Sequence, residues 1–365
     1  MRFVFKRSYN DDIGWFKHRT QAIYYMVLLA FVVALPWLLD DFFLGEATNV
    51  LIWAIVGMGL MLLTGHTGQV SLGHAAFMAV GCYANIIMMQ RGVPFIVALP
   101  LSGLITGIVG AIVALPVLRL HGIYLAIATL AISVLAEDII VIAEPFTGGV
   151  SGLVAPPIDL FGMQITRYGT PTAFYFITLI VVLAVLFAYR NLLRAPLGRA
   201  FAAIRDSEIS AQAMGVNITA TKAISFGLSC TATGLAGALL GHFAGAFNHE
   251  TFNIVLSIQL LLMIVIGGLG SIHGAFFGAI VIGFLPQVIA IGRDVTSSLF
   301  GFGSLTIPGI EVGVFALILL VFILFEPMGI YGRWLKIRTY FELFPFYRKG
   351  MFKRQKSYLK TERTR

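Results

Sequence analysis

Two long stretches without charge constrain the fold of this chain more than any other feature. No Lys, Arg, Asp or Glu occurs from Ala47 to Gln90, or again from Thr251 to Gly292. Each stretch is long enough for two crossings of a bilayer at roughly 20 residues per helix. A turn that faced water between two spans would usually carry charge, so these stretches predict helical hairpins whose turns are buried in protein.

The overall composition indicates the class of protein. The 365 residues are 58% hydrophobic and 12% charged, whereas a soluble domain is roughly 45–50% apolar. The sequence therefore predicts an all-α integral membrane protein, folded as one polytopic helical bundle. The first apolar run, residues 22–39, is followed by no clear small-residue cleavage pattern, so we expect it to remain as the first span.

Ten apolar runs are candidate transmembrane segments. They are residues 22–39, 48–64, 72–90, 95–117, 122–142, 172–189, 223–242, 256–268, 274–290 and 308–325. The run at 256–268 is short for a full crossing, so it either extends upstream or belongs to a broken helix. The expected division is a cytoplasmic N-terminal segment (1–21), a transmembrane domain (22–330) with a cytoplasmic loop at 190–222, and a basic cytoplasmic tail (331–365).

The distribution of Lys and Arg predicts the topology. With the N-terminus inside, ten crossings place 22 of the 25 cations on the cytoplasmic side and only Arg91, Arg167 and Arg293 in outer loops. This asymmetry follows the positive-inside rule and predicts that both termini are cytoplasmic. We therefore attribute the net charge of +8 to orientation and lipid contact, and expect no nucleic-acid partner. The basic tail either binds anionic headgroups or is a disordered, solvated segment.

Two glycine-rich segments lie within the charge-free stretches. They read GHTGQVSLGHAAF at residues 65–77 and GGLGSIHGAFFG at residues 267–278. A constant offset of 199 residues aligns Gly68 with Gly267, His74 with His273, Ala76 with Ala275 and Phe77 with Phe276. The repeat predicts two pseudo-symmetric halves with broken or short helices, and such interruptions point to a translocation path. The candidates for this path are Gly68, Gln69, Ser71, His74, Gly267, Gly268, Ser271 and His273.

The polar residues of these segments have two possible kinds of role. We expect Ser71 and Ser271 to cap the helices that follow, whose positive dipole ends would face the passage. His74 and His273 either form hydrogen bonds within the bundle or contact the substrate directly.

Two carboxylates, Glu137 and Asp138, fall inside a predicted span. An ion-coupled carrier needs ionisable groups deep in the bundle, whereas this pair lies near the outer end of its span. Glu137 is retained as a candidate for the path, against the alternative that the pair faces a wet vestibule or the membrane interface.

Several kinds of chemistry have no counterpart in the sequence. It contains no GxxxxGK[ST] phosphate loop, HExxH metal pair or GxSxG nucleophile elbow. Cys82 and Cys230 stand alone in apolar runs, which favours packing over a disulfide or a metal site. We therefore expect a transporter that binds no cofactor or metal, which is either passive or powered by another subunit, and no enzyme.

The basic loop at 190–222 contains a predicted amphipathic helix. Pro196 suits the start of a helix, after which Leu197, Phe201 and Ile204 recur at spacings of three and four. Such a helix on the cytoplasmic side would lie on the membrane surface or fit a groove in a partner protein.

Four motifs in order carry a resemblance to a known family. They are LLTGHTGQVSLGHAAFMAVGCYA, LRLHGIYLAIATLA, PLGRAFAAIRDSEISAQAMGVN and VIGGLGSIHGAFFGAIVIG. Together they resemble the branched-chain amino-acid ABC transporter permeases, specifically the M-type (LivM-like) subunit. The resemblance extends from about Asn49 to Gly329, and the tail beyond Tyr331 falls outside it.

The resemblance implies a set of partners in the bacterial inner membrane. It implies a heterodimer with an H-type permease, two cytoplasmic ATPases that use the ATP, and a periplasmic substrate-binding protein. The loop departs from the EAA signature of sugar permeases, so contacts known for those permeases do not transfer. By position, the candidates for coupling to the ATPases are Gly198, Arg199, Ala200, Arg205, Glu208 and Gly215.

The substrate and the energy source are open at this stage. Related permeases are associated with leucine, isoleucine and valine, but also with urea and short amides. A secondary carrier and an intramembrane enzyme are further alternatives, and neither is supported by a suitable arrangement of residues. Among the outer arginines, Arg91, Arg167 and Arg293, we expect at least one to pair with an acidic patch on the binding protein.

Overall fold

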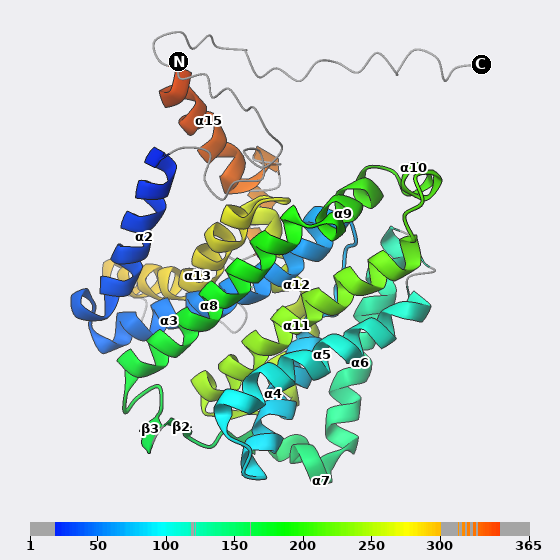
Figure 1. The fold of residues 1–365 in the computed structure, drawn as a ribbon. Coiled ribbons are helices and arrows are strands. Elements are labelled where there is room, and N and C mark those ends of the chain that lie inside the picture. Colours follow the sequence, from blue (N-terminus) through cyan, green and yellow to red (C-terminus); the bar gives the residue numbers. More distant parts are fainter. Residues whose placement is uncertain are drawn as a thin grey trace.

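The computed structural model is almost entirely helical (Figure 1). It describes residues 19–300, apart from 118, 119, 121 and 161, and residues 328–343, with isolated positions between 313 and 325. The long helices are α2 (Arg19–Leu38), α3 (Asp41–Leu60), α4 (His74–Gln90), α5 (Phe95–Val117), α6 (Ile123–Ile142), α8 (Pro171–Arg194), α11 (Ile218–Ala244), α12 (Ile254–Gly267) and α13 (Ile272–Phe300).

The predicted spans agree well with these helices. Each of the first nine runs coincides with a long helix, and the tenth, 308–325, lies outside the described residues except at isolated positions. Within the described part, eight helices are long and apolar enough to cross a membrane. The short run at 256–268 extends upstream, since α12 and the preceding turn together cover His249–Gly267. The chain is therefore a multi-span helical membrane protein.

Short elements lie at the two ends of the bundle. They are α7 (Glu144–Thr147), η2 (Gly149–Ser151), β1 (Leu153–Val154), β2 (Ile158–Leu160), β3 (Met163–Ile165), α9 (Pro196–Asp206), α10 (Glu208–Ala213), β4 (Ala246–Phe247), η3 (His249–Phe252) and α15 (Gly329–Leu343). Strands β1 and β4 pair antiparallel, as do β2 and β3. Figure 1 shows α9, α10 and α15 at one end and the β2–β3 hairpin with α7 at the other. The loop at 190–222 thus lies at the same end as α15.

Helix α11 is the centre of the packing, and small residues let its neighbours approach closely. A methyl group added at Gly237 would overlap the carbonyl oxygen of Met78 on α4, and one at Gly234 would overlap Thr106 on α5. Lipid tails are as apolar as a leucine side chain, so association of helices in a bilayer depends on such close contact. A methyl group at Gly241 would likewise overlap the sulfur of Cys82 on α4. The two free cysteines are fully buried, as predicted for packing residues.

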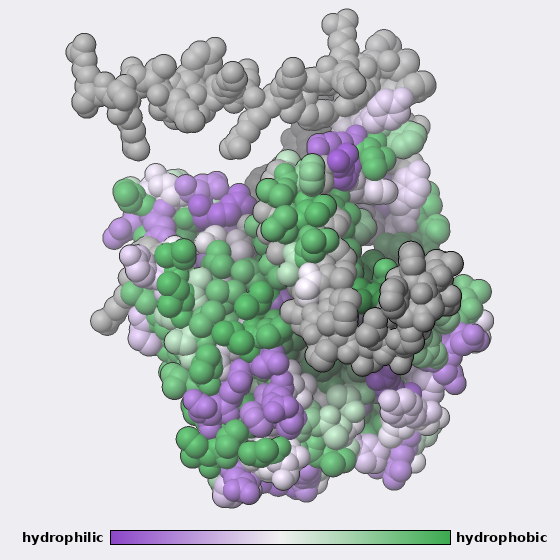
Figure 2. Space-filling model, turned by 180° about the vertical axis from the view of Figure 1, so that it is seen from behind, coloured by the Kyte–Doolittle hydropathy of each residue, from purple (hydrophilic) through white to green (hydrophobic). Residues whose placement is uncertain are grey.

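Burial separates the central helices from the outer ones. The span formed by α3 and its continuation is 78% buried, whereas the α2 span is 0% buried. Figure 2 shows hydrophobic side chains over a broad middle region of one face, with hydrophilic ones gathered above and below it. In water such a surface would be costly to expose, but in a bilayer it faces hydrocarbon of the same polarity.

Candidate functional site

The first glycine-rich segment is a break between two helices. Helix α3 widens into a π-helical turn, η1 (Met61–His66), and the chain then runs without helix until α4. The carbonyl groups at such a helix end need new donors where water is scarce. Leu63 O accepts from the hydroxyl of Thr67 and from the amide of Gln69. The break is therefore held together by its own short loop.

The predicted cap at Ser71 is wrong. Helix α4 begins only at His74. Its N-cap is Gly73, which has no side chain to form a capping hydrogen bond. Because the helix starts three residues later than Ser71, the serine lies outside its first turn. Its Oγ contacts Nδ1 of His74 at 2.9 Å and accepts from the amide of Gly73, the N-cap residue, at 3.4 Å.

Hydroxyl groups from other helices accept from backbone amides within and just before the first turn of α4. Thr129 Oγ1, on α6, accepts from the amide of Leu72 at 2.9 Å, and Ser257 Oγ, on α12, accepts from the amide of Ala75 at 3.1 Å. Helix N-termini leave amide donors without intrahelical partners, and these donors must be satisfied inside a membrane protein. Three helices are thereby joined at the first break.

His74 is fully occupied by contacts within the bundle. Its Nδ1 contacts Ser71 Oγ and its Nε2 contacts Ser229 Oγ, on α11, at 2.8 Å. The side chain is 1% exposed and packs against the rings of Phe77 and Phe226, which also contact each other. Of the two roles considered for His74, the structure shows the hydrogen bond within the bundle.

The second glycine-rich segment is a shorter break between α12 and α13. Gly268 and Gly270 have φ values of +110° and +82°, which side-chain-bearing residues rarely adopt. Ser271 Oγ accepts from the amide of Gly274 at 2.9 Å, so the predicted cap at Ser271 is confirmed. A methyl group at Gly267 would overlap the Gly274 carbonyl group, which fixes glycine there for packing.

His273 has different surroundings from His74, although the two residues align. Its Nε2 lies 2.7 Å from the hydroxyl of Tyr25, on α2, and its ring stacks on Tyr331, on α15, at 5.6 Å. The side chain is half-buried. The internal similarity predicted from the sequence therefore applies to the two backbone breaks and does not extend to the contacts of the two histidines.

The two breaks touch each other directly. A methyl group at Gly65 would lie 2.7 Å from the amide nitrogen of Gly270. The same amide lies 3.0 Å from the sulfur of Met61, in η1. The segments that the sequence pairs by similarity are thus in backbone contact.

The loop at 190–222 packs on the breaks. Helix α9 begins at Pro196, as predicted, but Phe201 and Ile204 are 0% and 2% exposed. They face α8, α11 and η1 of the same chain. Phe201 and Ile204 are therefore available neither to the membrane surface nor to a partner's groove, whereas Leu197, the third residue of the predicted apolar face, is 36% exposed.

Arg205, at the end of α9, reaches both breaks. Its Nη1 donates to the carbonyl oxygen of Gly65 at 3.0 Å. A methyl group at Gly68 would lie 3.3 Å from Arg205 Cγ, and one at Gly270 would lie 3.8 Å from Arg205 Nη1. The guanidinium also pairs with the exposed carboxylate of Asp206 at 3.2 Å.

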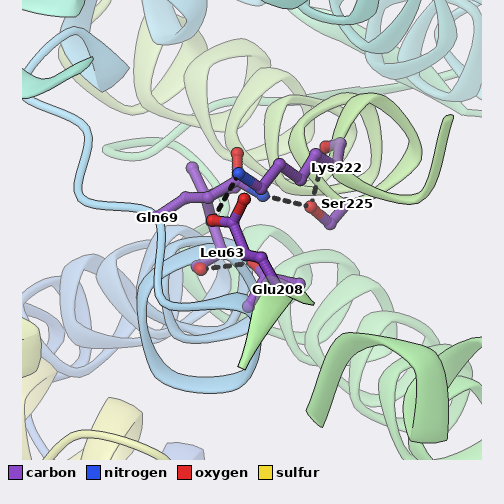
Figure 3. Close-up of polar contacts among 6 residues, drawn as sticks. Leu63, Gln69, Glu208, Lys222 and Ser225 are labelled. Carbon is purple, nitrogen blue, oxygen red and sulfur yellow. Dashed lines mark hydrogen bonds and ion pairs between the residues drawn. The ribbon is translucent and has the colours of Figure 1, made fainter. Parts of the chain in front are cut away.

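An ion pair whose lysine is buried lies beside the first break. Lys222 Nζ donates to Glu208 Oε1 at 2.6 Å, and Lys222 is 5% exposed. Gln69 Nε2 donates to Ser225 Oγ at 3.1 Å, and Figure 3 shows the two contacts next to each other. Gln69 Oε1 has no hydrogen-bond partner among the described residues. Helix α10 and the first break are therefore both bonded to the first turns of α11.

The other candidates for coupling differ in exposure. Gly198 is buried where α8 turns into α9, and a side chain there would overlap Leu193. Arg199 and Gly215 are exposed, and Ala200 is half-buried. The largest exposed apolar side chains of the loop are Ile209 and Met214, each 83% exposed, which the sequence analysis did not single out.

The outer candidates are not brought to the breaks. The guanidinium of Arg167 lies 3.9 Å from the ring centroid of Phe243 and 3.9 Å from Glu46 Oε1, so it is held within the chain. Arg91 is exposed at the end of α4, and the side chain of Arg293 lies outside the described residues. Glu137 lies about two turns along α6 from Thr129. One of its carboxylate oxygens is buried without a hydrogen-bond partner in the described part of the chain.

Comparison with known proteins identifies relatives over most of the chain. The family model of the branched-chain amino acid transport system permease component matches residues 42–325. The high-affinity branched-chain amino acid transport system permease protein LivM of Salmonella typhimurium is 32% identical over 284 residues, covering 72% of this chain and 67% of the relative. LivM of Escherichia coli K12 is 31% identical over the same shares.

More distant relatives carry the name of the second permease of such systems. The probable branched-chain amino acid transport permease protein LivH of Methanocaldococcus jannaschii is 25% identical over 298 residues, covering 80% of this chain and 91% of the relative. No solved structure is significantly similar to the chain.

Proposed function

This chain belongs to the family of branched-chain amino acid transport permease components, and we propose on this premise that it is one membrane-spanning subunit of an ATP-driven importer for leucine, isoleucine and valine. The family match over residues 42–325 is the observation that carries the proposal, because it includes both glycine-rich breaks and the loop between α8 and α11. The LivM relatives transport branched-chain amino acids by their names.

The two breaks form the cytoplasmic part of the path in this proposal. Interrupted helices are tolerated at membrane depth only where protein or a water-filled cavity surrounds them. The backbone contact between Gly65 and Gly270 supports such a role, because a small movement there changes the spacing of α3, α4, α12 and α13 together. His74 keeps the first break in shape, and substrate choice is left largely to the binding protein.

The exposed side of the loop is the docking surface for the ATPases. Ile209, in α10, and Met214, at its C-cap, are each 83% exposed, and α10 lies at the end of the bundle where α9 also lies (Figure 1). Exposed apolar side chains on a short polar loop are typical anchors for a partner. Arg199 and Gly215 lie on the same exposed surface, so the ATPase-facing set comprises these four residues.

The remaining partners follow from the family. An H-type permease completes the membrane part, two ATPases bind on the cytoplasmic side, and a periplasmic protein delivers the substrate. In the bacterial inner membrane, both termini then face the cytoplasm, as the distribution of Lys and Arg favours. Of the two candidate arginines whose side chains the structure describes, Arg91 is the exposed one left for docking of the binding protein, since Arg167 is engaged by Glu46 and Phe243.

Substrate competition in proteoliposomes tests the proposed substrate class. The chain is reconstituted with an H-type permease, two ATPases and the binding protein encoded beside it, and uptake of labelled leucine is measured. Excess isoleucine or valine is expected to reduce the uptake, whereas excess urea or a short amide leaves it unchanged. Uptake of urea without uptake of leucine would assign the subunit to the other substrate class.

A further inference from the structure

The end of the first broken helix also accepts one hydrogen bond from a side chain of the loop at 190–222. A helix terminus leaves carbonyl groups without intrahelical donors. In η1 the hydroxyl of Thr67 donates to the carbonyl oxygens of Leu62 and Leu63. Arg205 Nη1 donates to the carbonyl oxygen of Gly65 at 3.0 Å. A cation at a helix C-terminus also interacts favourably with the helix dipole. Arg205 therefore caps η1 from a segment 140 residues away in the chain.

The same side chain contacts both sides of the junction between the breaks. Gly68 packs against the aliphatic part of the Arg205 side chain, and Gly270 packs against Arg205 Nη1. Gly65 itself packs on the backbone of Gly270. Arg205 thus lies where η1, the loop after it and the start of the second break meet.

A second attachment holds the neighbouring helix α10. Glu208, the first residue of α10, pairs with Lys222 in the first turns of α11. Ser225 Oγ donates to the Lys222 carbonyl and accepts from Gln69, which belongs to the first break (Figure 3). Helices α9 and α10 are therefore fastened to the break by two groups of contacts, and Arg205 belongs to the one that touches both breaks.

From these contacts we infer that Arg205 is the positioning residue that transmits movement of the ATPase-facing loop to the two glycine-rich breaks. The inference rests on the proposed function, because it requires ATPases that move the loop. The loop and the junction move as one body through the bond from Arg205 to Gly65. The ion pair of Glu208 and Lys222 keeps α10 aligned while this happens.

The ratio of leucine transported to ATP hydrolysed separates this role from a purely structural one. Arg205→Gln removes the charge and the fork of donors, while Ile209 and Met214 still bind the ATPases. The assembled complex of this variant is expected to hydrolyse ATP at close to the normal rate and to transport at least about tenfold less leucine per ATP. An unchanged ratio would overturn the inference.

Asp206→Asn is the matched control. Asp206 is the other partner of the Arg205 guanidinium, and its side chain is 72% exposed. Its loss leaves the bond to Gly65 intact, so the ratio of transport to hydrolysis is expected to stay normal. A fall equal to that of Arg205→Gln would show that the surface pair matters instead of the contact with the breaks, and would also overturn the inference.

A covalent replacement of the contact gives a test that does not depend on Arg205→Gln folding. A β-carbon built at Gly68 lies 3.8 Å from Arg205 Cβ, which is close to the usual separation in a disulfide. Cys82 and Cys230 are buried and do not compete. In the double variant Gly68→Cys, Arg205→Cys, transport per ATP is expected to be low when the pair is reduced and to recover when it is oxidised.

Gly68→Cys alone is the control for the covalent test, because Gly68 has a φ of +72° that strains any side chain. An oxidised double variant that stays as uncoupled as the reduced one would contradict the inference. If wild-type complexes show no ATP-driven uptake at all, the proposed function fails. If they show it and all variants match the wild type, only the role of Arg205 fails.

Discussion

Lys222 Nζ donates a hydrogen bond to Glu208 Oε1 at 2.6 Å, and the two side chains differ in burial. The Lys222 side chain is 7% exposed, whereas that of Glu208 is 37% exposed. A charge-assisted hydrogen bond of this length is strong, and its two members are not equivalent. Water reaches Glu208 if its partner is lost, whereas the ammonium group of Lys222 would remain buried.

Removal of the two charges is therefore expected to have unequal effects. Glu208→Gln leaves a buried ammonium group without its carboxylate, for which about 3–5 kcal/mol is typical. Lys222→Met leaves a carboxylate that water can hydrate, and we expect a loss of about 1 kcal/mol. Thermal unfolding of the purified protein in detergent measures both. Equal losses of unfolding free energy in the two variants would contradict the difference in burial between Lys222 and Glu208.

The close approach of α11 and α4 predicts a strict need for glycine at Gly237. Gly237→Ala places a methyl group on the carbonyl oxygen of Met78, and backbone shifts of this kind cost about 1–3 kcal/mol. Gly292→Ala, on α13, is the matched control because its added methyl group meets nothing within 4 Å. We expect the melting temperature to fall for the first variant only. A normal melting temperature for Gly237→Ala would show that the helices are spaced differently.

His74 and His273 are expected to differ in their importance for stability. His74→Ala leaves the buried hydroxyls of Ser71 and Ser229 without their partner, and an unmade buried hydrogen bond costs about 1–3 kcal/mol. His273 is half-buried and keeps fewer groups satisfied. Unfolding in detergent should therefore occur at a lower temperature for His74→Ala than for His273→Ala. The reverse order would show that the ring of His74 is not fixed by those contacts.

Arg91 and Arg167, whose surroundings the structure describes, are expected to affect different measurements. Arg167→Ala removes a guanidinium that lies over Phe243, so we expect a stability loss of about 0.5–2 kcal/mol. Arg91→Glu reverses an exposed charge and should slow association of the binding protein, most clearly at low salt. Stopped-flow binding to proteoliposomes at two salt concentrations measures the second effect. Slower association for Arg167→Ala alone would assign docking to Arg167.

Much of the fold was accessible from the sequence because apolar length fixes transmembrane helices. The first nine predicted spans all coincide with helices, and the charge-free stretches mark the two breaks that meet at Gly65 and Gly270. The start of α9 at Pro196 also followed from local chemistry. These features depend on short-range patterns, which a single sequence records directly.

Contacts between distant segments could not be obtained in this way. The acceptance of amides at the start of α4 by Thr129 and Ser257 depends on which hydroxyls neighbouring helices present, so the prediction for Ser71 failed. The burial of Phe201 follows from how α9 folds back on its own chain. Arg205 binds a backbone carbonyl group, and any residue type at position 65 has one, so no sequence signal marks this pair.

Uptake of leucine by proteoliposomes with a controlled energy source tests the central claim most directly. The complete assembly is reconstituted with the binding protein on one side and the ATPases on the other, and ionophores remove all ion gradients. The account predicts uptake that requires ATP hydrolysis, persists with the ionophores and disappears when the ATPases are omitted. Uptake by this chain alone, driven by an ion gradient without ATP, would contradict it and identify a secondary carrier.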